Sequence, residues 1–140
     1  MSGEGDQPHY LYLELGDVLD LHAQIFGWDF QQAADQLRDR AGLEGALARP
    51  STHAHYEDAD LATQAAVLAH GIAEGQHFID GNKRTALVAM RTFLAINGFD
   101  VTASQAERAG WVLGLSAGLS VAALAEQLRG RMVSVVVRGE

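Results

Sequence analysis

The chain has 140 residues, of which 48% are apolar, and its formal net charge at neutral pH is −8. This length suits one domain with a single buried core. The acidic balance disfavours a nucleic-acid partner, because duplex affinity rests largely on Lys and Arg side chains that neutralise phosphates. No apolar run approaches the roughly 20 residues that span a bilayer, so no membrane partner is expected either.

The termini and the absence of cysteine bear on where the protein resides. With no cysteine, the chain has no disulfide and no thiolate chemistry. The start, MSGEGDQPHYLYLELGD, lacks the basic and apolar regions of a signal peptide. We therefore expect a cytoplasmic protein with a single domain over 1–140, in which 1–9 form a flexible N-terminus and 131–140 a C-terminal tail.

The N-terminal third is predicted to be helical. Residues 17–26 carry apolar side chains at helical spacing, with His22 on the same inner face. Asp29 is suited to cap a second helix over 30–40. A short turn of helix over 42–50 is expected to end at its final proline.

The middle of the chain contains a polar stretch followed by a strongly periodic one. STHAHYED, at 51–58, is expected to form a polar loop or a small hairpin. Asp58 or Asp60 can then cap a helix whose apolar residues recur at 3.6 spacing over 61–72. GQHFIDG, at 75–81, breaks that helix.

Helix signals continue towards the C-terminus. The next helix is predicted to begin around Asn82 and to stop at Asn97-Gly98. SQAE at 104–107 is a capping box for a helix that reaches about residue 114. Ser120 can cap a last helix that ends near residue 130. MVSVVVRGE, at 132–140, reads as a short strand or an ordered tail, so the predicted fold class is a compact all-α bundle with one small hairpin.

The segment DGNKRTAL, at 80–87, combines features of an anion site. Gly81 allows a close turn, and Asn82, Lys83 and Arg84 supply the first N–H groups of a helix, which lack intrahelical partners. These donors, the helix dipole and two cations favour a phosphate. Asp80 could hold a divalent cation through its carboxylate. The alternative is an ordinary helix start with a capping aspartate and solvated basic residues; the spacing is not that of a Walker A loop.

The sequence HFIDGNKRTAL resembles the motif of the Fic/Doc family, and in particular its death-on-curing (Doc) branch. Three flanking stretches, LRDRAGLEGALARP, LAHGIAEG and LAINGFDV, are also similar to the family. The resemblance covers residues 10 to about 130 and implies a Fic-like helical bundle with a short β-hairpin flap. The general Fic pattern has Gly at the position of Lys83 and a second Arg at that of Leu87, and both differences favour the Doc branch.

The resemblance also implies an activity and its partners. Fic-type members usually attach AMP to a protein hydroxyl, whereas the Doc branch is similar to toxins that phosphorylate elongation factor Tu and are held in check by an antitoxin. The family therefore implies ATP or another nucleoside triphosphate as co-substrate, with Mg²⁺, a protein Ser/Thr hydroxyl as acceptor and an antitoxin protein as partner.

Roles in the family can be carried over by position. Phe78 would anchor the loop, Asp80 would bind Mg²⁺, residues 81–83 would form the anion nest, and Arg84 would contact phosphate. The flap that docks the target chain would consist of Ser51, Thr52, His53, Ala54, His55 and Tyr56.

One position departs from the family at the point where the chemistry needs a base. The family's catalytic histidine stands four residues before the motif's aspartate, and here that residue is Gln76, with His77 next to it. A neutral amide has no useful basicity, whereas imidazole suits proton transfer at neutral pH. Gln76 can still orient a hydroxyl by hydrogen bonding. His77 is the nearest substitute, although adjacent loop residues generally point in different directions.

Several interpretations of Gln76 stay open. The chain is a Doc-like protein with altered chemistry or target, a non-catalytic relative that binds nucleotide or protein, or a toxic enzyme disarmed by substitution. A helical interaction protein without a nucleotide site is a further alternative. His22 is predicted to be a structural residue of the core, and His53 and His55 to lie in a solvated flap.

Overall fold

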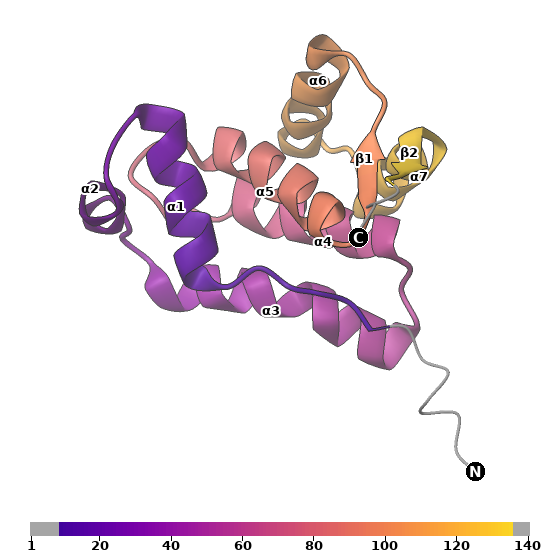
Figure 1. The fold of residues 1–140 in the computed structure, drawn as a ribbon, viewed down its shortest axis with the longest axis horizontal. Helices are drawn as coiled ribbons and strands as arrows, with labels where there is room; N and C mark the ends of the chain where they lie inside the picture. The colour runs from indigo at the N-terminus through magenta and orange to yellow at the C-terminus, as the bar shows by residue number, and fades with distance from the viewer. Residues whose placement is uncertain (1–8, 136–140) are drawn as a thin grey trace, which may run out of the picture.

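The computed structural model describes residues 9–135, so residues 1–8 of the expected flexible N-terminus and 136–140 of the expected C-terminal tail lie outside the described residues. Over this range the chain forms seven helices and two short strands (Figure 1). They are α1 (Leu15–Phe26), α2 (Phe30–Asp35), α3 (Arg40–Glu57), α4 (Leu61–Glu74), α5 (Asn82–Ile96), β1 (Phe99–Val101), α6 (Gln105–Ser116), α7 (Val121–Arg131) and β2 (Met132–Ser134). The predicted all-α fold class is confirmed.

Helix α4 forms the centre of the molecule. It contacts α3, α5, α6 and α7, and most of its residues are buried on every side. Many of them are alanines, which let neighbouring helices approach closely. At Gly71 an added Cβ would come within 3.0 Å of the Ala46 side chain on α3. The position of α4 fixes where its C-terminal end, and the loop that follows it, can lie.

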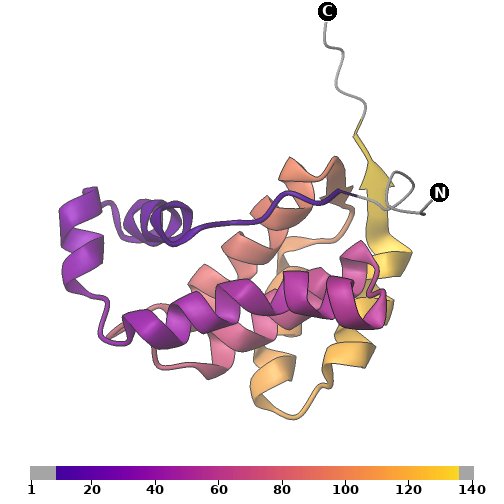
Figure 2. The same ribbon diagram turned by 90° about the horizontal axis from the view of Figure 1, so that it is seen from below.

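The segment before α1 is held in an extended course beside α3 (Figures 1 and 2). The Asn97 side chain, at the end of α5, accepts from the Leu11 N–H at 2.9 Å and donates to the Leu11 carbonyl at 2.9 Å. Tyr12 stacks on Phe93 of the core, with ring centroids 5.8 Å apart. These contacts attach the N-terminal segment to α5.

Strand β2 confirms the strand predicted near the C-terminus. It pairs antiparallel with β1, so that Asp100 lies opposite Val133. The two strands are separated in sequence by α6 and α7 and bring the end of α7 back to the end of α5 (Figure 1).

Two expectations about the N-terminal half were wrong. The short helix does not end at Pro50, and 51–57 form neither a loop nor a hairpin, because α3 continues to Glu57. The buried residues of α3 are Leu43, Ala46, Leu47 and Pro50, so the proline continues the stripe that packs on α4. This tertiary packing outweighs the local preference of proline to stop a helix.

The second helix ends at Asp35 and does not reach residue 40. Residues 36–39 leave the helix because their backbone groups bond to the loop after α4, as described below. No helix among residues 9–135 is both long and apolar enough to cross a membrane.

Candidate functional site

The loop at 75–81 joins α4 to α5 and ends in a sharp turn. Gly81 has a φ of 81° and precedes α5 without offering a side chain to cap it. Helices α4, α6 and α7, in contrast, are capped by the side chains of Asp60, Ser104 and Ser120. Within residues 9–135, no acceptor bonds the first three N–H groups of α5. These donors and the positive end of the helix dipole therefore face outward, as an anion site requires.

The buried rings of Phe78 and His22 hold the loop against the core. Phe78 is 0% exposed, and the His22 imidazole stacks on it with centroids 3.9 Å apart and planes 9° apart. His22 Nε2 lies 2.9 Å from the Asp80 carbonyl oxygen. A carbonyl can only accept, so Nε2 carries the proton and donates. His22 is therefore a core residue, as predicted from its helix face, and it also fixes the backbone at Asp80.

The Asn82 side chain holds the same loop by two hydrogen bonds to the backbone of Phe78. Its Oδ1 accepts from the Phe78 N–H at 3.0 Å, and its Nδ2 donates to the Phe78 carbonyl at 3.0 Å. Because this side chain is already bonded at both ends, the group that Asn82 offers to a ligand is its backbone N–H.

Gly81 is needed for space as well as for its backbone angle. A Cβ at this position would lie 2.6 Å from the Phe26 ring. The Arg84 guanidinium lies over the same ring, 5.3 Å from its centroid, at a distance suited to a cation–π contact. Phe26 thus packs against the turn and orients one of its two cations.

A short antiparallel contact ties the loop to the segment between α2 and α3. The Ile79 N–H donates to the Gln36 carbonyl at 2.9 Å, and the Arg38 N–H donates to the His77 carbonyl at 2.7 Å. Leu37 and Phe78 form an isolated β-bridge at this point. Backbone hydrogen bonds therefore hold the loop against the segment between α2 and α3, and the Asn82 side chain adds two more to the Phe78 backbone.

A cavity of about 270 Å³ opens over this loop. Its walls combine the predicted site residues with the end of α4. They are Ala73, Gly75, Gln76, Ile79, Asp80, Gly81, Asn82, Lys83 and Arg84. The structure thus brings together Gln76 and all of the residues predicted from the motif at 80–84.

Asp80 offers one exposed carboxylate that could bind a metal ion. Its Oδ1 accepts from the Gly81 N–H at 2.8 Å, and the exposed carboxylate borders the cavity. The described part of the chain contains no group of three side chains that could hold a metal ion unaided. Mg²⁺ is commonly bound by one or two carboxylates together with substrate phosphates. The residues present therefore fit a Mg²⁺ ion that arrives with a nucleotide better than a metal held by the protein alone.

Gln76 and His77 point to different parts of the molecule. Gln76 is exposed and borders the cavity, and its Oε1 accepts from Arg38 Nη2 at 3.1 Å. His77 is 5% exposed, and its Nε2 lies 3.0 Å from the Gly71 carbonyl oxygen in the core. The imidazole does not border the cavity, so this placement disfavours His77 as a substitute base.

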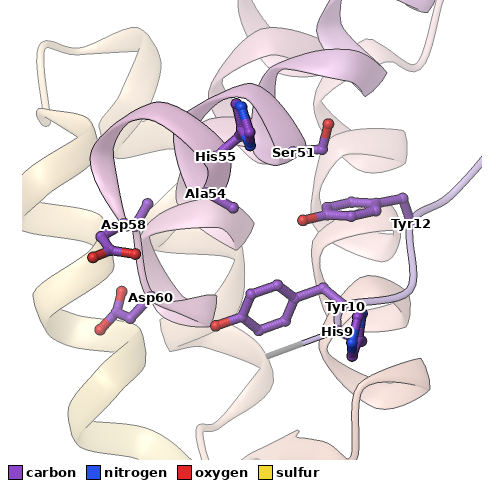
Figure 3. Close-up of a pocket in the computed structure, with 9 residues that line it drawn as sticks. His9, Tyr10, Tyr12, Ser51, Ala54, His55, Asp58 and Asp60 are labelled. Atoms are coloured by element: carbon purple, nitrogen blue, oxygen red, sulfur yellow. The ribbon is translucent and has the colours of Figure 1, made fainter. Parts of the chain in front are cut away.

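The residues expected to form the flap lie elsewhere. Ser51, Ala54 and His55 border a separate cavity of about 540 Å³ together with Tyr10 and Tyr12 (Figure 3). Ser51 stands 11 residues after the start of α3, which places it about 16 Å along the helix axis from the end that meets the loop. The structure does not bring the 51–56 segment to the cavity of Gln76.

The sequence does not predict that Arg38 contacts Gln76. Periodicity assigned Arg38 to the second helix, whereas it lies in the segment that pairs with the loop. Its contact with Gln76 spans 38 positions in sequence. The residues alone carry no signal for such a contact.

Comparison with known proteins agrees with this site. The model of the Fic/DOC family matches residues 12–94, which include the loop and the whole cavity wall. The Toxin Doc of Mycolicibacterium smegmatis (strain ATCC 700084 / mc(2)155) is 38% identical over 94 residues, which are 66% of this chain and 68% of that protein. The chain belongs to the Fic/DOC family.

Proposed function

We propose that the 75–84 loop binds the phosphates of a nucleoside triphosphate such as ATP, with Mg²⁺ held between them and Asp80. The observation that carries this proposal is the start of α5, where three N–H groups have no acceptor within the described range 9–135 and lie beside Lys83 and Arg84. Backbone donors at a helix start, together with cationic side chains, stabilise the negative charge of phosphates.

The biological role we propose is that of a Doc-like toxin in a toxin–antitoxin pair. Its support is family membership and the similarity to a protein named Toxin Doc. In this role the chain transfers a phosphate or nucleotidyl group to a protein Ser/Thr hydroxyl, for which elongation factor Tu is the target that the resemblance implies. A separate antitoxin protein would restrain it.

Gln76 favours a second function for the chain as it stands. In the part of the chain that the structure describes, no histidine borders the cavity. Assistance by a general base is typically worth about 10²–10⁴ in rate. A cavity that keeps the phosphate-binding groups but lacks imidazole suits a module that binds a nucleotide or protein without turnover. Transfer by the chain as written should therefore be slow or altered.

Binding is tested first, with the full chain and isothermal titration of MgATP. We expect the Lys83→Ala variant to bind about 10-fold more weakly than the unsubstituted chain, because it removes one charged phosphate contact. Arg91→Ala is the matched control, since Arg91 is an exposed cation on the same helix that borders a different cavity. Equal affinity in the Lys83→Ala variant, or no binding by the unsubstituted chain, would refute the nucleotide site.

Turnover is tested separately by intact-mass spectrometry of elongation factor Tu after incubation with MgATP. We expect little or no mass shift with the unsubstituted chain and a shift of one phosphate or nucleotidyl group with Gln76→His. A shift of equal rate with both proteins would show that Gln76 does not limit the reaction. Binding of MgATP without a shift in either protein would favour the binding module.

A further inference from the structure

In the contact between Arg38 and Gln76, Arg38 is the hydrogen-bond donor and Gln76 is the acceptor. One guanidinium reaches both oxygens of this residue: Arg38 Nη2 donates to Oε1 at 3.1 Å, and Nε donates to the backbone carbonyl at 3.3 Å. The backbone of Arg38 is itself fixed, because its N–H donates to the His77 carbonyl at 2.7 Å. The backbone that carries this guanidinium is therefore part of the short antiparallel contact that holds the loop.

This geometry determines which end of the Gln76 amide faces the guanidinium. A guanidinium has only donors, so the amide must present its oxygen to Arg38 and turn its NH₂ group the other way. Among the hydrogen bonds of residues 9–135, none uses this NH₂ group. A nearby positive charge also polarises the amide and makes its NH₂ a stronger donor.

The surroundings of Gln76 show what this donor would meet. Gln76 borders the same cavity as Lys83, Arg84 and the N–H groups at the start of α5. All of these are donors or cations that favour a negatively charged oxygen. The Gln76 oxygen that could orient a target hydroxyl is already bonded to Arg38.

We propose that Arg38 is a positioning residue that holds Gln76 as a hydrogen-bond donor to a phosphate oxygen, so that residue 76 binds the nucleotide and does not activate a hydroxyl. This inference rests on the proposed nucleotide site and assigns a specific function to the residue that replaces the family's histidine. It predicts that the substitution at this position adds to phosphate binding while it removes the base.

Inorganic triphosphate and MgATP are the probes, titrated into the full chain by calorimetry. Gln76→Ala is expected to weaken the binding of both probes about 10-fold, as the loss of a hydrogen bond to a charged group does. Gln76→Glu should weaken it further, because a carboxylate replaces the donor with a negative charge. Arg38→Ala should weaken binding several-fold by releasing the amide.

A double-substitution cycle separates positioning from direct contact. If Arg38 acts through Gln76, Arg38→Ala has no further effect on affinity in the Gln76→Ala background. A further loss of affinity in that background would mean that Arg38 contacts the phosphate itself, and it would overturn the positioning role. Arg40→Ala is the matched control, since Arg40 is a neighbouring exposed arginine whose partner is Glu44 on the surface. It should bind both probes as the unsubstituted chain does.

The direct readout is the side-chain amide of Gln76 in ¹⁵N-correlated NMR spectra. Inorganic triphosphate should shift this NH₂ signal in the unsubstituted chain, and the shift should shrink in Arg38→Ala. If Gln76→Ala binds as tightly as the unsubstituted chain while Lys83→Ala binds weakly, this inference is wrong and the nucleotide site stands. If the unsubstituted chain binds neither probe, both are wrong.

Discussion

Gly75 leaves room for the buried His77 side chain, because glycine has no side chain of its own. The His77 imidazole occupies the space where a Cβ on Gly75 would lie. That imidazole is buried and bonded to the Gly71 carbonyl, so it cannot move aside without losing a hydrogen bond. The backbone at Gly75 is ordinary extended chain, with φ of −80°, so the requirement for glycine is steric.

A residue-scale prediction follows from this overlap. Gly75→Ala should lower the free energy of unfolding by about 1–3 kcal/mol, the usual cost of overpacking. Thermal denaturation followed by circular dichroism measures the change. Gly45→Ala is the control, because an added Cβ there meets no atom within 4 Å and alanine favours a helix interior. A melting temperature of Gly75→Ala equal to that of Gly45→Ala would contradict the overlap.

At the scale of elements, the helix starts show how local chemistry and tertiary contacts combine. The Asp60 side chain caps α4 by accepting from the Thr63 N–H at 2.9 Å. It also accepts from Arg129 Nε of α7 at 2.7 Å. The hydrogen bond from Arg129 is the largest cause that lowers the pKa of Asp60 from its ordinary 3.8 to about 2. One carboxylate thus starts a helix and joins it to another.

The lowered pKa predicts how stability depends on pH. A carboxyl group whose pKa is lower in the folded state stabilises the fold above its unfolded pKa, and this stabilisation is lost as pH falls from about 4 to about 2. Both side chains are about half exposed, so the ion pair should contribute about 1 kcal/mol or less. Urea denaturation at several pH values measures it.

Asp60→Asn is the informative variant for this prediction. Asparagine caps a helix about as well as aspartate but carries no charge. The variant should be less stable than the unsubstituted chain at pH 6, and the difference should vanish near pH 2. A difference of constant size across this range would show that the charge of Asp60 does not contribute.

At the scale of the whole molecule, α4 is the element that joins the two halves of the fold. It contacts helices from both halves of the chain. The two tryptophans lie in different regions, with Trp28 beside Phe26 near the loop and Trp111 buried in α6. If α4 couples these regions, they should unfold together.

Leu68→Ala tests this coupling. Leu68 is 1% exposed in the middle of α4, and its truncation should cost about 2–5 kcal/mol. Single-tryptophan proteins, made with Trp28→Phe or Trp111→Phe, report each region by fluorescence during urea denaturation. Leu68→Ala should lower the denaturation midpoint equally in both. Separate midpoints would show two independently unfolding parts.

The sequence by itself determined the features that depend on neighbours in the chain. The caps at Asp29, Ser104 and Ser120 follow from side chains that bond within a few residues. The donor-rich start of α5 follows from the opposite cause, the lack of a capping side chain at Gly81, and Asn97 ends the same helix. The motif at 80–84 was likewise visible without a structure, and the departure at Gln76 is what the family resemblance implies.

Only the tertiary structure decided the contacts that join distant segments. Pro50 lies inside a helix because its face packs on α4, and residues 36–39 leave the helical course because their backbone bonds to the loop. The same pairing places Arg38 on Gln76, and the buried His77 bonds to Gly71 away from the cavity. Short-range preferences are worth about 1 kcal/mol per residue or less, apart from proline, whereas burial and hydrogen bonding across the core act on many residues together. Where the two conflict, the core prevails.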